Sequence, residues 1–124
     1  MRWIVDAMNV IGTRPDGWWR DRDAAMARLV DRLERFSAHS GDDVTVVFER
    51  KPNPPIRSTV IQIAHATKRG PDAADFEIVK IVEADANPKS IQVVTSDRWL
   101  GDRVSSLGAT VFPSEPFRSR IDDS

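Results

Sequence analysis

The chain has no cysteine among its 124 residues. This absence excludes disulfide bonds, thiolate metal sites and a cysteine nucleophile. A strong excess of one charge is also missing, because 18 Lys and Arg residues balance 19 Asp and Glu residues to a formal net charge of −1. A polyanion would therefore have to be recognised by a local basic patch and not by the overall field of the protein.

Long hydrophobic runs are missing as well. No apolar run approaches the roughly 18 residues that span a bilayer, and the sequence does not open with the charged and apolar regions of a signal peptide. We therefore expect no membrane association and a cytoplasmic location. With 40% apolar and 30% charged residues, the composition predicts one ordinary globular domain with enough chain for a core.

Short apolar runs alternate along the chain with segments of helical periodicity. The runs are rich in β-branched residues and do not alternate with polar ones, which is typical of buried parallel strands. We expect strands at 2–6, 44–49, 58–63 (continuing as far as 65), 91–96 and 109–113, and helices at 21–39, 71–84 and 98–107. This order predicts parallel pairing through right-handed crossovers, and so a three-layer α/β sandwich.

Three segments lack such periodicity. Residues 8–19 are rich in Gly, Pro and Trp, and 50–55 contain three prolines that deny backbone donors, so both are predicted to be loops. Residues 119–124 are polar, and we predict that they form a loose tail after a domain at 1–118.

Acidic residues stand where two of the predicted strands end. Asp6 closes the first strand, and Asp97 follows the fourth. The carboxyl ends of parallel strands line the crevice in which α/β proteins bind ligands. Asp75 lies in the first turn of the helix at 71–84, on the same face as three apolar residues, so its side chain is predicted to point inward.

Each acid alone also has a purely structural interpretation. Asp97, for example, could cap its helix through the N–H groups of Trp99 and Leu100. Three converging carboxylates are harder to explain as caps, because they repel one another unless a cation neutralises them. Hard oxygen ligands favour Mg²⁺ or Mn²⁺. Asp72 and Asp102 are weaker candidates for a fourth acid.

Two polar residues accompany these acids. Asn9 lies three residues after Asp6, where its amide could pin the loop, hold a metal-bound water or serve only as a turn residue. Ser96 precedes Asp97 and could support it in a similar way.

These residues carry a resemblance to a known family. The motifs are Asp6-Ala7-Met8-Asn9 after the first strand, Ala74-Asp75 at the third helix, Val94-Thr95-Ser96-Asp97-Arg98 after the fourth strand, and the short strand Gly108-Ala109-Thr110-Val111. Together they resemble the YacP-like branch of the NYN domains, which are PIN-like, metal-dependent ribonucleases. The resemblance implies the strand order 3-2-1-4-5, metal ligands at Asp6, Asp75 and Asp97, and supporting roles for Asn9 and Ser96.

The sequence departs from the family pattern after the second strand. Members often have a phenylalanine-aspartate pair there, whereas this chain has Phe48-Glu49. Glu49 could serve in that place with a longer reach, and we include it among the supporting polar residues.

Basic and aromatic residues gather in the loops at the same predicted edge of the sheet. The basic ones fit phosphate positioning; they are Arg14, Arg20, Arg50, Lys51, Lys68, Arg69 and Arg98. Trp18 and Trp19 could stack on unpaired bases, or one of them could anchor its loop to the core. Trp99 has the same two interpretations.

The function expected from the sequence is metal-dependent hydrolysis of single-stranded RNA, with internal cleavage and with Mg²⁺ or Mn²⁺ as cofactor. The alternative is a catalytically degenerate RNA-binding or ribosome-associated module of the same fold. Other phosphoryl-transfer enzymes fit less well. A haloacid-dehalogenase-type phosphatase would need a second Asp where Met8 stands, and no glycine-rich phosphate loop with a lysine occurs.

Overall fold

Five parallel strands form one sheet at the centre of the molecule. The computed structural model describes residues 1–123. The strands are β1 (Arg2–Asp6), β2 (Asp43–Phe48), β3 (Gln62–His65), β4 (Ile91–Val94) and β5 (Thr110–Phe112). Their order is β3-β2-β1-β4-β5, and every pairing is parallel. The predicted sheet and strand order are confirmed.

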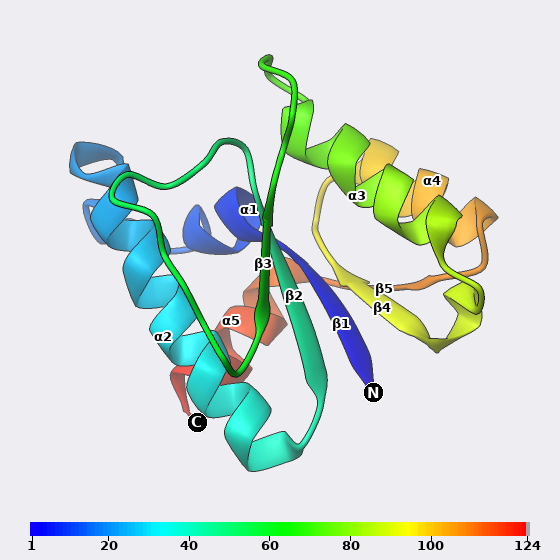
Figure 1. The fold of residues 1–124 in the computed structure, drawn as a ribbon, viewed down its shortest axis with the longest axis horizontal. Helices are drawn as coiled ribbons and strands as arrows, with labels where there is room; N and C mark the ends of the chain where they lie inside the picture. Colours follow the sequence, from blue (N-terminus) through cyan, green and yellow to red (C-terminus); the bar gives the residue numbers. More distant parts are fainter. Residues whose placement is uncertain (124) are drawn as a thin grey trace.

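Helices cover both faces of the sheet (Figure 1). They are α1 (Ala7–Ile11), α2 (Arg22–Ser40), α3 (Ala73–Ala84), α4 (Arg98–Ser106) and α5 (Ser114–Asp122), with 3₁₀ turns η1 (Trp18–Arg20) and η2 (Pro88–Ser90). One apolar core lies between the sheet and α1, α2 and α5, and a second lies between the sheet and α3 and α4. The predicted three layers are therefore present.

The central position of β1 explains where the functional residues meet. β1 pairs with β2 on one side and with β4 on the other, with Val5 opposite both Val46 and Val94. All three of these valines are fully buried. The chain leaves β1 at Asp6 and leaves β4 through Thr95, so these two residues emerge side by side at the carboxyl edge of the sheet.

Two predicted elements begin later than expected. β3 starts at Gln62, because the Ser58 hydroxyl accepts the N–H groups of Val60 and Ile61 in a local turn, which competes with strand pairing. The third helix starts at Ala73, two residues after Pro71.

The predicted loop at 8–19 contains regular structure. The single-turn helix α1 follows β1 directly and buries Ala7, Val10 and Ile11. These three apolar residues have the i, i+3, i+4 spacing of one helix face, but a segment this short gives too little periodicity to be recognised.

The prediction of a loose polar tail was wrong for residues 119–122. They belong to α5, which buries Phe117 and Ile121 completely. Phe117 packs against the rings of Trp3, Phe36 and Phe112, with centroids 5.1, 5.5 and 6.2 Å away. Ser124 lies outside the described residues.

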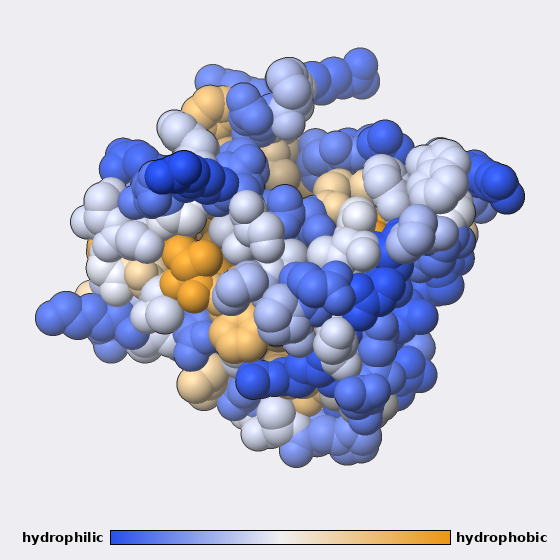
Figure 2. Space-filling model, turned by 180° about the vertical axis from the view of Figure 1, so that it is seen from behind, coloured by the Kyte–Doolittle hydropathy of each residue, from blue (hydrophilic) through white to orange (hydrophobic). Residues whose placement is uncertain are grey.

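The surface is mostly polar. The face shown in Figure 2 is largely hydrophilic, with apolar colour confined to small spots. Within residues 1–123, no helix is both long enough and apolar enough to cross a membrane.

Candidate active site

The three predicted acids come from the ends of three different elements. Asp6 is the last residue of β1, Asp75 lies in the first turn of α3, and Asp97 is the N-cap residue of α4. All three elements have these ends at the carboxyl edge of the sheet. Asp6 is only 5% exposed, whereas Asp75 and Asp97 are partly accessible.

Asp6 is a buried carboxyl group in an acidic environment. The pKa of Asp6 is raised to about 7, chiefly by burial and in part by the nearby charges of Asp75 and Asp97. Hydrogen bonds from the Thr95 hydroxyl and the Asn9 backbone N–H act in the opposite direction, since they favour the ionised form. Near neutral pH the Asp6 carboxyl group is therefore stabilised either by binding a proton or by a cation close to it.

Asp75 shares this environment. The pKa of Asp75 is raised to about 6, chiefly by partial burial and in part by the charges of Asp97 and Asp72. The inward orientation predicted from its helix face agrees with this burial. The charges of Asp75 and Asp97 act on Asp6, and that of Asp97 acts on Asp75; we refer to these three residues as the acidic cluster.

Asp97 has a structural function in addition to its charge. One of its carboxylate oxygens accepts the N–H of Leu100 at 2.8 Å and so caps α4. The backbone N–H of Asp97 donates to the Thr95 hydroxyl at 3.1 Å, and that hydroxyl donates to Asp6 at 2.9 Å. Thr95, which is 1% exposed, thus links the two acids.

Asn9 holds together the loops around the cluster. Its side-chain oxygen accepts the backbone N–H of Ser96 at 2.8 Å and the hydroxyl of Ser114 at 2.6 Å. The Ser96 hydroxyl in turn accepts the backbone N–H of Ser114 at 3.0 Å. The side chains of Asn9 and Ser96 therefore fix the start of α5 against the loop that carries Asp97.

Sequence reasoning missed Thr95 and Ser114. Both are buried hydroxyl groups, 1% and 0% exposed. For Thr95 a signal was present, since it is a polar residue that ends an apolar strand two positions before Asp97. Ser114 gave no such signal, because its partner Asn9 lies 105 residues away in the sequence.

The other candidate acids, Glu49, Asp102 and Asp72, differ from one another in their surroundings. Glu49 accepts a hydrogen bond from the guanidinium of Arg22 at 3.0 Å, on the side of the sheet covered by α2. Asp102 is exposed on α4. Asp72 is the N-cap residue of α3 but makes no capping hydrogen bond through its side chain; its charge acts on Asp75 instead.

The predicted basic residues fall into two groups. Arg14 is paired with Glu115, and Arg50 with Asp23. The second group is exposed and has no ion-pair partner within residues 1–123; it consists of Arg20, Lys51, Lys68, Arg69 and Arg98. These unpaired cations can contact an anionic ligand without first breaking an ion pair.

Trp18 and Trp19 differ in environment. This agrees with the interpretation that one of the two anchors its loop to the core. Trp18 packs against the core cluster below α2, and the guanidinium of Arg22 lies 5.3 Å from its ring centroid. Trp19 is 50% exposed and meets the Trp18 ring edge-on at 5.8 Å.

The chemistry of the cluster fits a hard divalent cation. Its donors are carboxylate oxygens whose mutual repulsion a cation would relieve. Within residues 1–123, no three Asp, Glu or His side chains are close enough to form a ready-made cage around one ion. Mg²⁺ commonly uses only one or two carboxylates and keeps several waters, so the donor set is compatible with it.

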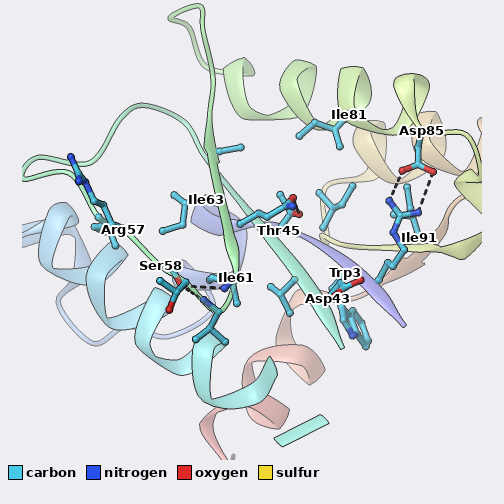
Figure 3. A pocket seen from close by; sticks show the side chains of 18 residues that line it. Trp3, Asp43, Thr45, Arg57, Ser58, Ile61, Ile63, Ile81, Asp85 and Ile91 are labelled. Atoms are coloured by element: carbon cyan, nitrogen blue, oxygen red, sulfur yellow. Dashed lines mark hydrogen bonds and ion pairs between the residues drawn. The ribbon is translucent and has the colours of Figure 1, made fainter. Parts of the chain in front are cut away.

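A large hollow lies elsewhere. It has a volume of about 1260 Å³ and lies toward the ends where the strands begin, near Asp43, Thr45 and Ile91 (Figure 3). Arg2 donates to both carboxylate oxygens of Asp85 at its margin. None of the three clustered acids lines it, so it is separate from the candidate site.

A parallel α/β sheet of this order, with acids at its carboxyl edge, is the arrangement that the resemblance to PIN-like NYN domains implied. The family model of the YacP-like NYN domain matches residues 3–124. The chain belongs to the YacP-like NYN domain family.

Curated proteins similar in sequence to this chain come from Xanthomonas oryzae pv. oryzae. UPF0178 proteins of two strains of Xanthomonas oryzae pv. oryzae, PXO99A and MAFF 311018, are 38% identical over 108 residues, or 86% of this chain and 63% of the relative. The chain thus spans less than two thirds of the length of these relatives.

Two crystal structures of Rae1 (YacP) from Bacillus subtilis share the fold. One has a TM-score of 0.80 with 19% identity and covers 99% of this chain and 74% of Rae1. The other, a tryptophan-to-leucine mutant, has a TM-score of 0.76 with 22% identity and covers 99% and 75%.

Proposed function

We propose that this chain is a metal-dependent endoribonuclease that hydrolyses single-stranded RNA. The observation that carries the proposal is the cluster of three carboxylates at the carboxyl edge, where the pKa of Asp6 is raised to about 7 and that of Asp75 to about 6. Such shifts are typical of functional sites. Membership of a PIN-like nuclease family supports the reaction class.

In this proposal Asp6, Asp75 and Asp97 would hold Mg²⁺ or Mn²⁺ together, one or two of them as direct ligands and the others through metal-bound water. When bound, the metal lowers the pKa of a water molecule and neutralises charge on the scissile phosphate. Thr95 keeps the Asp6 carboxylate oriented through its hydroxyl, and Asn9 keeps the loop of Asp97 in place. The unpaired cations Lys68, Arg69 and Arg98 position the RNA backbone.

The test is cleavage of a mixture of single-stranded RNAs by the wild-type chain with Mg²⁺, Mn²⁺ or EDTA. Asp97→Asn should lose cleavage while it keeps the fold, because asparagine caps a helix as well as aspartate does. Asp102→Asn, an exposed acid on the same helix, is the matched control and should cleave like the wild type.

Equal cleavage by Asp97→Asn would contradict the assignment of that acid. RNA binding that persists in EDTA, with no cleavage under any condition, would instead favour the alternative function, a degenerate RNA-binding or ribosome-associated module.

A further inference from the structure

Two exposed aromatic rings lie next to the acidic cluster. Phe76 follows Asp75 in the first turn of α3, and Trp99 lies two residues after Asp97 in the first turn of α4. Their ring centroids are 5.5 Å apart, and the ring planes meet at 74°. Phe76 is 58% exposed and Trp99 is 49% exposed.

This exposure is not explained by packing alone. The contact between α3 and α4 and the sheet is already made by fully buried apolar residues, among them Ile78, Leu100 and Val104. An aromatic pair that only braced the two helices would bury most of its surface. Instead, about half of the surface of each residue remains accessible to a ligand.

Two unpaired cations lie beside one member of the pair. Phe76 lines a hollow of about 760 Å³ together with the loop at 67–71, which carries Lys68 and Arg69, and with Asp72, Glu77 and Lys80. Lys68 and Arg69 have no ion-pair partner within residues 1–123. Lys80 lies 3.7 Å from Glu77. A flat apolar surface beside free cations matches the two parts of a nucleotide, the base and the phosphate.

We infer that Phe76 and Trp99 form a stacking subsite for one unpaired base of the RNA, with its phosphate held by Lys68 and Arg69. Aromatic stacking of this kind accepts any base, because every base has a π-face. Such a subsite would select single-stranded RNA, since a paired base cannot turn its face to a protein ring. This inference rests on the proposed function and specifies its substrate.

The experiment measures the affinity of a short, labelled single-stranded RNA in EDTA, where no cleavage occurs. Trp99→Leu and Phe76→Leu keep an apolar side chain but remove the ring, and should weaken binding roughly 5- to 150-fold. Trp99→Phe keeps a ring and should bind nearly like the wild type. Val60→Ala removes an equally exposed apolar side chain, 47% accessible, and should have no effect.

A second arm tests whether the ring contacts a base. One abasic position in the RNA should weaken binding to the wild type, and should cause little additional loss in Trp99→Leu, because the two changes remove the same contact. Thermal unfolding checks that each variant is folded.

The outcomes separate this inference from the proposed nuclease function. The subsite is overturned, and the nuclease function is kept, if the wild type cleaves the RNA in Mn²⁺ and Trp99→Leu binds the RNA as tightly as the wild type does. A wild type that neither binds nor cleaves overturns both. A change of molecular mass in solution for Trp99→Leu, with unchanged RNA affinity, assigns the pair to a protein contact and also overturns the subsite.

Discussion

Asp6 carries a buried charge that the metal-free chain compensates only in part. Its carboxylate accepts the Thr95 hydroxyl at 2.9 Å, but burial and two neighbouring acids oppose its ionisation. The folded state therefore binds a proton at Asp6 more tightly than the unfolded state does. Stability from this group is fully present below the ordinary pKa of 3.8 and is lost as the pH rises toward about 7.

Asp6→Asn should consequently stabilise the metal-free protein at pH 8. The amide removes the charge and still offers an oxygen to Thr95, so the free energy of unfolding in EDTA should rise by on the order of 2–4 kcal/mol. Below pH 4 the difference from the wild type should vanish. Urea unfolding across this pH range measures it, and a variant no more stable than the wild type at pH 8 would contradict the buried charge.

Single residues also show where prediction from sequence succeeds and fails. Asp6, Asp75 and Asp97 could be found because each has a local signal, namely a strand end or an apolar helix face. The contact of Ser114 with Asn9 and the pairing of Glu49 with Arg22 could not be found in this way. Both depend on side chains that the fold brings together from distant segments.

At the scale of elements, α5 fixes the loop that carries Asp97. Its first residue, Ser114, bonds to Asn9 and Ser96, and its buried residues Phe117 and Ile121 anchor it to the core. The segment was predicted to be partly loose because its composition is polar overall. Its two apolar residues, at i and i+4, suffice to dock a short helix onto a core that is already formed.

Ile121→Ala should therefore be strongly destabilising. The side chain is 0% exposed, and truncation of a buried isoleucine costs about 2–5 kcal/mol. Thermal or urea unfolding measures the loss, and Asp123→Ala, an exposed position just after the helix, is the control. A change below about 0.5 kcal/mol, typical of a surface substitution, would show that the end of α5 is not docked.

The five strands were predictable because buried parallel strands give continuous β-branched runs, and their order came with the family resemblance. The exact starts of β3 and α3 could not be predicted, because they are decided by local hydrogen bonds of Ser58 and by the turn before Ala73. Short elements such as α1 fall below the length at which periodicity is informative.

At the scale of the whole molecule, a nearly neutral chain concentrates both signs of charge at one edge. The formal net charge is −1, yet the three clustered acids and the unpaired cations Lys68, Arg69 and Arg98 all lie where the strands end. This arrangement favours local recognition of a phosphate backbone over attraction by the overall field.

We propose that the acidic cluster makes this chain a metal-dependent ribonuclease, and the decisive measurement is single-turnover cleavage of a labelled single-stranded RNA across a range of Mn²⁺ concentrations. The wild-type rate should be zero in EDTA and should saturate with Mn²⁺. Asp6→Asn, expected to be the more stable protein, should be at least about 100-fold slower at every concentration, since a metal ligand is lost. Wild-type cleavage in EDTA, or equal rates for Asp6→Asn and the wild type, would contradict the claim.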